Sequence, residues 1–278
     1  MSHTLSTIIV NYNAGPLLRK CVDSLLACPL DIEIIVVDNA SSDASLDGLQ
    51  DLSQVCVIRN PANVGFAAAC NIGVQASSAP FLLFLNPDCF FQPDPIAPLL
   101  AGLQSGDRVG MVGGLLVNED GTEQGGGRRA VPTPWRSFVR AFGLQRFANR
   151  WPKLFYDFHL HKQPLPDSPI EVEAISGACM LVKRDVMEDV GLWDEGYFLH
   201  CEDLDWCMRF RQNLPNTRNI QSFALGKYPV TQEEWSVVMD NKPGESKGRK
   251  IPVIFISWNE AQLFVQKLRN LCISHPQH

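Results

Sequence analysis

The first part of the chain alternates short apolar runs with stretches whose apolar residues recur every three or four positions. Residues 7–10 form a β-branched run, the apolar positions of 17–26 follow helical spacing, and 32–37 are again continuously apolar. A continuous run is typical of a buried strand, and the wider spacing is typical of a helix that covers it. The pattern predicts strands at 7–10, 32–37, 55–58, 81–85 and 109–116, and helices at 17–26, 65–76 and 95–104.

Strands that are apolar throughout and are separated by helices indicate a parallel sheet with helices on both faces. The sequence therefore predicts an α/β domain built on a mostly parallel sheet. In such sheets ligands bind outside the carboxyl ends of the strands. The residues that follow each apolar run are thus the first candidates for a functional site.

Each of the first four predicted strands is followed by residues rich in amides and carboxylates, at 11–13, 38–43, 60–65 and 86–88. Any one of these groups could simply form a turn or cap a helix, because Asn, Asp, Ser and Gly favour both. Taken together, they would converge on one rim of the sheet. Their mixture of an aromatic ring, amides and carboxylates favours a nucleotide as the ligand.

Individual residues on this rim suit different parts of a nucleotide. The Tyr12 ring can stack on a base, and the Asp38 carboxylate can accept hydrogen bonds from a base or a ribose. The helix that starts at Gly65 can offer backbone N–H groups to an anion. Asp88 follows a buried strand and the rigid Pro87, so it could hold a divalent ion whose remaining ligands come from a diphosphate. The alternative for Asp88 is a turn or a helix cap.

A second cluster of acidic and aromatic residues lies at 191–210. Such a mixture suits the binding of a hydroxylated ring and the removal of its proton by a carboxylate. Acidic residues also stabilise a helix start, so Glu202 and Asp205 could be structural. His200 is given no role, because a single histidine among aromatic residues is more often packed than functional. The candidates on the acceptor side are Trp193, Asp194, Glu195 and Glu202, with Asp203 as the base.

Composition narrows the class of protein. Hydrophobic residues make up 45% of the 278 residues and charged residues 19%, which is typical of a globular protein. The formal charge of −6 gives no basic footprint for a nucleic acid. The nine cysteines contain no C-x-x-C pair, which favours reduced core thiols, with Cys21, Cys56, Cys70 and Cys179 as examples. Apolar runs are too short for a transmembrane helix, so we expect a cytoplasmic protein.

A change in charge divides the chain. Residues 1–212 carry 16 basic and 25 acidic side chains, a net −9, whereas 213–278 carry 8 and 5, a net +3. Pro and Asn gather at 213–219, which is typical of a connector. We therefore predict a domain at 1–212, a linker at 213–222 and a separate segment at 223–278.

Six ordered motifs of the first segment resemble the inverting family 2 glycosyltransferases, especially their rhamnosyltransferase-like branch, which builds surface polysaccharides. The matching stretches are STIIVNYN (6–13), VVDNASSD (36–43), NPANVGFAAACNIG (60–73), LFLNPD (83–88), ISGACMLVKRD (175–185) and GLWDEGYFLHCEDLDWCMRF (191–210).

This resemblance implies a nucleotide-binding glycosyltransferase A fold, a nucleotide-diphosphosugar donor and a divalent cation, Mg²⁺ or Mn²⁺. Asp88 is similar to the second acid of the family's D-x-D element, whose first acid is Asn86 here, and Asp203 is similar to the base of the E-D motif. The resemblance implies that these residues contact the donor: Tyr12, Asp38, Asn39, Asn63, Gly65, Asn71 and Asn86.

The last segment resembles a different protein family. Residues 223–270, with G-K-Y-P-V-T-Q and S-W-N-E-A, resemble an amino-terminal fragment of the formylglycine-generating, sulfatase-modifying factor family. In the transferase family another strand and a loop with paired histidines follow the E-D helix, and here the tail replaces them. We therefore expect a transferase domain shortened at its C-terminal end, followed by a small α+β segment.

The sequence thus predicts inverting transfer of a sugar to a hydroxyl of a glycan or lipid-linked acceptor, in surface polysaccharide synthesis. A lipid-linked acceptor would place the protein at the inner face of the membrane, and peripheral association stays open. The alternative is a truncated fusion that binds nucleotide sugars with little or no turnover.

Overall fold

The computed structural model describes residues 3–91, 96–106, 109–118, 122–131, 133–147, 150–151, 169–212 and 219–222. One compact unit comprises residues 1–118 and 123–225, and it contains the whole architecture given below. A second unit comprises 119–122 and 226–278, of which the structure describes Thr122. The predicted segment at 223–278 therefore lies outside the described residues.

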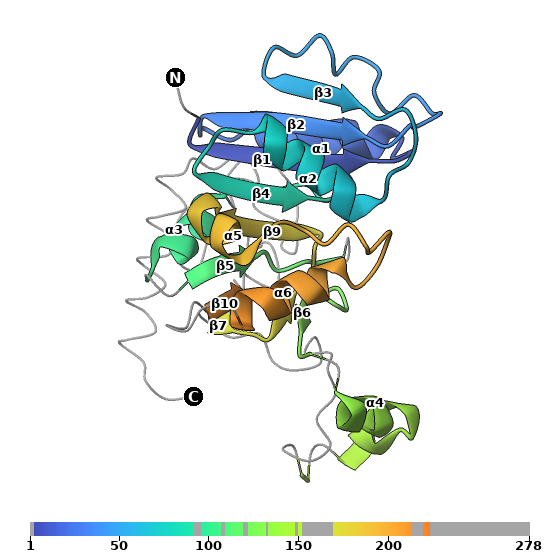
Figure 1. Ribbon diagram of the computed structural model, residues 1–278, viewed down its shortest axis with the longest axis vertical. Helices are drawn as coiled ribbons and strands as arrows, with labels where there is room; N and C mark the ends of the chain where they lie inside the picture. Colours follow the sequence, from blue (N-terminus) through green and yellow to red (C-terminus); the bar gives the residue numbers. More distant parts are fainter. Residues whose placement is uncertain are drawn as a thin grey trace, which may run out of the picture. The chain divides into compact units, whose positions relative to one another are not determined.

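A mostly parallel sheet of eight strands organises the described chain, in the order β3-β2-β1-β4-β9-β5-β10-β7 (Figure 1). The first four strands run parallel to one another, while β9 runs antiparallel between β4 and β5. Strand β10 is parallel to β5, and β7 is antiparallel to β10. The strands are β1 Leu5–Asn11, β2 Ile32–Asp38, β3 Val55–Arg59, β4 Phe81–Leu85, β5 Val109–Gly113, β7 Ile170–Glu171, β9 Cys179–Lys183 and β10 Asn219–Ser222.

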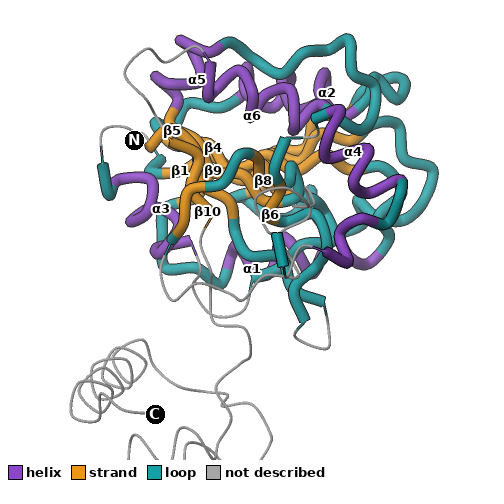
Figure 2. Tube along the Cα trace, turned by 90° about the horizontal axis from the view of Figure 1, so that it is seen from below, coloured by secondary structure: helices purple, strands orange, loops and turns teal. Residues whose placement is uncertain are grey.

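Helices cover both faces of this sheet, as Figure 2 shows. Helices α2, α5 and α6 pack on one face, and α1 and α3 pack on the other. A short two-stranded sheet pairs β6 with β8, and β6 precedes helix α4 in the chain. The bounds are α1 Pro16–Leu26, α2 Phe66–Ala76, α3 Ile96–Gln104, β6 Arg128–Arg129, α4 Pro134–Ala141, the 3₁₀ helix η1 Leu144–Phe147, β8 Ala174–Ile175, α5 Arg184–Val190 and α6 Glu202–Gln212.

The sheet separates two hydrophobic cores. Successive side chains of a strand point to opposite faces, so Ile8 of β1 joins the core under α2 and α6, and Ile9 joins the core under α1 and α3. Both side chains are buried, at 1% and 0% exposed. Burial on both faces is the reason that these strands read as continuous apolar runs, and it confirms the predicted mostly parallel, helix-covered sheet.

The structure differs from the sequence predictions in several places, and one is the strand predicted at 109–116, which ends at Gly113 as β5. Residues 219–222 were predicted as part of a linker, but they form β10 and extend the main sheet beside β5. The prediction of buried cysteines holds for Cys21, Cys70 and Cys179 but was wrong for Cys56, which is exposed because β3 is the edge strand. None of the described helices is both long and apolar enough to cross a bilayer.

Candidate active site

The carboxyl ends of β1 and β2 lie side by side because Asn11 pairs in register with Asp38. The buried Asn11 amide donates to Asp38 Oδ1 at 2.7 Å, and also to Ser41 Oγ at 3.0 Å and Ser45 Oγ at 2.8 Å. Asp38 is only 3% exposed, and its other oxygen accepts from the Ser41 N–H at 3.2 Å. The hydrogen bonds of Asp38 therefore fix the loop 39–45. A donor contact by this carboxylate stays a prediction.

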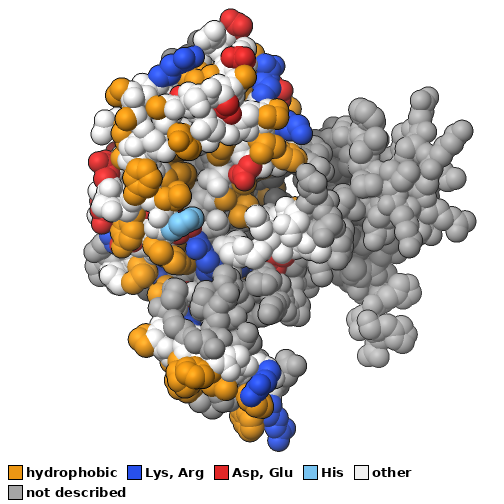
Figure 3. Space-filling model, turned by 90° about the vertical axis from the view of Figure 1, so that its right-hand side faces the viewer, with side chains coloured by type: hydrophobic (Ala, Val, Ile, Leu, Met, Phe, Trp, Pro, Cys, Tyr) orange, Lys and Arg blue, Asp and Glu red, His pale blue; other side chains and the backbone are white. Residues whose placement is uncertain are grey.

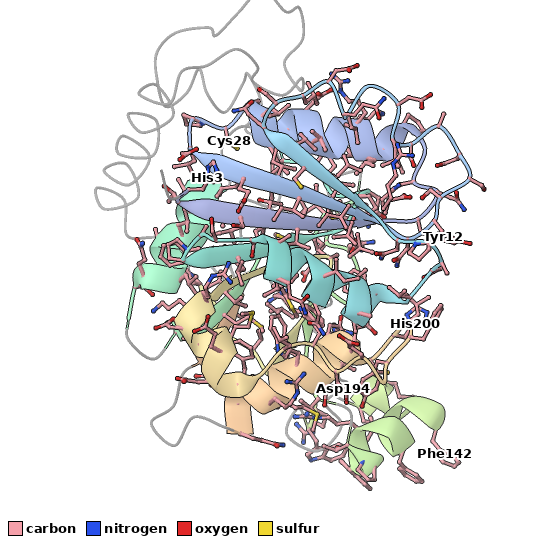
Figure 4. All side chains as sticks on the ribbon, turned by 45° about the horizontal axis from the view of Figure 1, so that its top comes forward. His3, Tyr12, Cys28, Phe142, Asp194 and His200 are labelled. Atoms are coloured by element: carbon pink, nitrogen blue, oxygen red, sulfur yellow. The ribbon has the colours of Figure 1, made fainter. Side chains whose placement is uncertain are left out.

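Tyr12 is the exposed group at this strand end. Its side chain is 55% exposed immediately after the buried Asn11. Figure 4 shows Tyr12 and His200 at the same end of the sheet, where the arrowheads of β1 and β2 lie. The predicted convergence of strand ends on one rim is thus seen in the fold, and the Tyr12 ring is accessible for stacking.

The turn before α2 is held by a chain of amide contacts rather than being left open. Asn60 Nδ2 donates to Asn39 Oδ1 at 2.8 Å, and Asn39 Nδ2 donates to the Gly65 carbonyl at 3.1 Å. Asn63 Oδ1 accepts from the Gly65 N–H at 3.0 Å. The expectation that this helix start offers free N–H groups differs from the structure, because the Phe66 N–H donates to the Phe198 carbonyl at 3.0 Å.

The same contact explains why residue 65 is glycine. Its φ is +89°, which L side chains rarely adopt, and a Cβ there would lie 2.8 Å from the Phe198 oxygen. The close approach of two backbones brings the loop 191–201 onto the start of α2. Gly65 therefore positions the loop 191–201 against α2, and a donor contact at Gly65 stays a prediction.

Asn71 joins the same loop from the middle of α2. Its Nδ2 donates to the Trp193 carbonyl at 2.9 Å and to Glu195 Oε1 at 2.8 Å, while its Oδ1 accepts from the Trp193 N–H at 3.1 Å. Asn71 and Trp193 are each 2% exposed. The Trp193 ring packs 4.2 Å from the Trp206 ring, centroid to centroid, so this side chain belongs to the core and is not at the acceptor surface.

The loop that contains Trp193 is nevertheless exposed elsewhere. Asp194 and Glu195 are exposed, and Phe198 and Leu199 are 59% and 58% exposed. Its last two residues, His200 and Cys201, have φ of +72° and +69°. Non-glycine residues in this region carry backbone strain, which gathers at functional sites. The strained turn leads directly into Glu202 and the start of α6.

Asp203 lies in the first turn of α6, where several neighbouring groups bind its carboxylate. Its Oδ2 forms an ion pair with Arg129 of β6 and accepts from the Gly177 N–H at 3.0 Å. Its Oδ1 accepts from the Leu204 N–H at 2.7 Å. Gly177 is suited to this approach because a Cβ there would lie 3.3 Å from the Asp203 Cβ. Arg129 was not among the predicted residues, and its place beside Arg128 after a glycine-rich stretch was the only signal.

The two neighbouring acids are used differently. Asp205 pairs with Arg209 one turn along α6, at 2.8 Å, which is a structural role. Glu202 is 8% exposed, and its Oε2 has no hydrogen-bond partner among the described residues. Burial raises the pKa of Glu202 above its usual value, and the charge of Asp203 adds to the shift. Of the three acids, Asp203 is the one held by groups from other elements.

Asp88 and Asn86 form the turn after β4. The Asn86 N–H donates to the Ala178 carbonyl at 2.9 Å, and the Asn86 carbonyl accepts from the Cys89 N–H at 3.0 Å, while Asp88 is exposed. Burial raises the pKa of Cys89 to about 12, with the nearby Asp88 carboxylate contributing to the rise. The described residues contain no group of three metal-ligating side chains. One exposed carboxylate still fits Mg²⁺ or Mn²⁺, which take one or two protein carboxylates together with substrate phosphates.

Comparison with known proteins shows which family and which relatives the chain is similar to. The sequence profile described as glycosyl transferase family 2 matches residues 6–191. The chain is 29% identical over 218 residues to the N-acetylglucosaminyl-diphospho-decaprenol L-rhamnosyltransferase of Mycobacterium tuberculosis, covering 74% of this chain and 69% of that protein. It is 26% identical over 243 residues to the low-salt glycan biosynthesis hexosyltransferase Agl10 of Haloferax volcanii, covering 84% and 70%.

Solved structures show the same fold. GalNAc-T7, crystallised with UDP, GalNAc and Mn²⁺, aligns with a TM-score of 0.58 and 19% identity, covering 80% of this chain. This chain spans 42% of the GalNAc-T7 chain, less than half. Staphylococcus aureus TarS 1–349 aligns with a TM-score of 0.54 and 13% identity, covering 98% of this chain and 72% of that one.

Proposed function

Because the chain belongs to glycosyl transferase family 2, we propose that it transfers a sugar from a nucleotide-diphosphosugar to a hydroxyl of a glycan or lipid-linked glycan, with inversion at the anomeric carbon. The glycosyltransferase A fold predicted from the sequence is confirmed by the sheet and by the structural relatives. The relative from M. tuberculosis carries a diphospho-decaprenol acceptor in its name, which supports a lipid-linked acceptor for this chain.

The setting of Asp203 is the observation that carries this proposal. A carboxylate has about four lone-pair positions, and Arg129, Gly177 and Leu204 occupy three of them. The remaining position is on Oδ1, because Oδ2 already accepts twice. We assign Oδ1 as the atom that receives the proton of the acceptor hydroxyl.

The reaction then proceeds as one displacement. The acceptor oxygen forms a bond to the anomeric carbon as its proton moves to Asp203 Oδ1, and the bond from that carbon to the diphosphate oxygen breaks. The nucleoside diphosphate leaves with the electron pair of the broken bond. Attack opposite the leaving group inverts the configuration.

The donor would bind at the rim formed by the ends of β1, β2 and β4. Tyr12 would stack on the base, and Asp88 would hold a divalent cation, which would neutralise charge on the diphosphate. The further donor contacts that we propose are Asp38, Asn39, Asn63, Gly65, Asn71 and Asn86. Asp38, Asn39, Asn63 and Asn71 also fix the loops around the site. The exposed loop 194–199 would line the acceptor.

The domain boundaries and the tail remain part of the proposal. We place the transferase domain at 1–212 and add β10, since 219–222 extend its sheet. Residues 223–270 lie outside the described residues, and their resemblance to a sulfatase-modifying factor fragment stays a prediction. A lipid-linked acceptor would bring the enzyme to a membrane face.

Release of nucleoside diphosphate tests the proposed function. When the protein is incubated with a panel of nucleotide sugars without acceptor, we expect slow release from at least one donor, because water can replace the acceptor hydroxyl. Release is measured by coupled phosphate detection or chromatography, with heat-denatured protein as the control. Donor binding in calorimetry without any release would favour the alternative, a nucleotide-sugar binding protein with little turnover.

The cation assignment has its own test. Asp88→Ala should weaken binding of UDP, dTDP or GDP in the presence of Mn²⁺ by about 1–3 kcal/mol, the value of a hydrogen bond or contact to a charged group. Without Mn²⁺ the variant and the parent should bind alike. Asp51→Ala is the matched control, because Asp51 is an exposed acid before β3, at the opposite end of the sheet. Equal Mn²⁺-dependent binding by Asp88→Ala and the parent would contradict the assignment.

A further inference from the structure

A short segment outside the donor rim exposes an unusual amount of aromatic surface. The described part of the chain has fifteen exposed large apolar side chains, and five of them lie between residues 135 and 151. Such a concentration marks an interaction surface, whereas scattered single residues do not. The five are Trp135 (49% exposed), Phe138 (44%), Phe142 (64%), Phe147 (38%) and Trp151 (51%).

Three of these rings form one ridge along α4. Trp135, Phe138 and Phe142 are spaced by three and four residues, so they lie on one side of the helix and its last turn. The Trp135 and Phe138 rings stack with centroids 5.6 Å apart, and Phe138 and Phe142 are 4.5 Å apart. Val139, in contrast, is fully buried. Helix α4 thus has one buried apolar side chain and an apolar side that is exposed (Figure 3).

The charge of this segment is opposite to that of the whole protein. Residues 124–151 contain six arginines and no acidic residue, although the chain carries a formal charge of −6. Three of these arginines pair with acids of the domain: Arg128, Arg129 and Arg136. Arg146 and Arg150 are exposed, and the Arg146 guanidinium lies 4.9 Å from the centroid of the Phe147 ring. Aromatic rings flanked by arginines are typical of segments that lie in a membrane interface.

The ridge is presented by a fixed helix. Arg136 donates to both Glu173 oxygens, at 2.7 and 2.9 Å, and to the Val131 carbonyl at 2.7 Å. The Val131 N–H donates to the same carboxylate at 2.7 Å. These contacts connect α4 to the segment between β7 and β8. The same stretch of the chain that contains the ridge also contains Arg129, which contacts the proposed base.

We propose that the aromatic–arginine surface, defined by Trp135, Phe138, Phe142, Arg146, Phe147 and Arg150, binds the surface of a bilayer that contains anionic lipids. The inference deepens the proposed function, on which it rests, because a lipid-linked acceptor lies in such a surface. Opposite charge favours this occupant: anionic headgroups attract the arginines while the rings enter the interface. A second copy of the chain is a poorer match, because a two-fold contact would bring the same arginines together.

Co-sedimentation of the full chain with lipid vesicles tests this inference. We expect binding to phosphatidylcholine vesicles to rise roughly tenfold or more when phosphatidylglycerol is included, and to fall in high salt. The double variant Phe138→Ser/Phe142→Ser should lower binding by about tenfold, because two exposed rings no longer enter the interface. Arg146→Gln/Arg150→Gln should lower only the part of the binding that depends on phosphatidylglycerol.

Two controls show whether lipid binding depends on this surface and is separate from catalysis. Leu17→Ser removes an exposed apolar side chain of α1, 37% exposed, and should bind vesicles like the parent. Release of nucleoside diphosphate from soluble donors should be unchanged in Phe138→Ser/Phe142→Ser, so a failure of the proposed activity is seen separately from a failure to bind lipid. The inference is overturned if the parent does not bind anionic vesicles, if the double variant binds them equally well, or if sedimentation velocity shows that the rings hold two copies together instead.

Discussion

Asp203→Asn is expected to lower sugar transfer by about 10²–10⁴-fold, the usual contribution of a positioned general base. Asparagine keeps the size of the side chain and can still accept from one of the Gly177 and Leu204 N–H groups, but it cannot take a proton at Oδ1. Donor binding should change by less than about twofold, because the base acts on the acceptor. Steady-state transfer assays and calorimetry with donor measure the two effects separately.

The neighbouring acids provide the controls for this variant. Asp205→Asn breaks a partly exposed pair with Arg209, which is worth roughly 0.3–0.5 kcal/mol of stability, and should leave transfer nearly unchanged. Glu202→Gln retains a buried polar side chain of the same shape, at a position whose Oε2 has no hydrogen-bond partner among the described residues. A fully active Asp203→Asn protein, or loss of transfer in Asp205→Asn instead, would remove Asp203 from the role of base.

Much of the sheet could be predicted from the sequence because burial on both faces leaves a direct trace. Strands such as β2 and β4 are apolar at nearly every position, and the predicted helix at 65–76 coincides with α2 within one residue. The direction of a strand leaves no such trace in the sequence. The run in β9 is as apolar as its neighbours, yet it is antiparallel to β4 and β5, and only the pairing in the folded sheet decides this.

The candidate site was harder to predict because the same residue types serve the core and the surface. Trp193 stands among acids in the sequence, but its ring packs against Trp206 and Phe84. Asn71 was expected at the donor, whereas its amide is buried and ties α2 to the loop 191–201. The strained backbone at His200 and Cys201 was not predicted from the sequence, since positive φ is uncommon for non-glycine residues, even for histidine, which adopts it more often than most.

Arg129→Met is expected to lower kcat by roughly 10- to 100-fold with little change in the KM for the donor. The variant removes the cation that orients Asp203, and a hydrogen bond to a charged group is worth about 1.5–3 kcal/mol, which corresponds to one or two factors of ten in rate. Arg129 acts through Asp203, so it is a positioning residue. The ion pair joins residues 74 positions apart, which explains why sequence spacing did not reveal it.

Conservative replacement and a neighbouring arginine distinguish positioning from a general loss of structure. Arg129→Lys should restore part of kcat, because an ammonium group keeps a positive charge and N–H donors beside Asp203, whereas the guanidinium of Arg129 reaches both Asp203 and the Ile175 carbonyl, the latter at 2.8 Å, through one nitrogen, Nη2. Arg128→Met breaks a buried bidentate pair with Glu123, at 2.7 Å for each contact, and should lower the free energy of unfolding by about 3–5 kcal/mol. Its kcat, measured below the melting transition, should stay near the parent value. Were Arg129→Met to lose stability like Arg128→Met while keeping the kcat of the parent, the ion pair with Asp203 would be structural, and the base would be oriented by the Gly177 and Leu204 N–H groups alone.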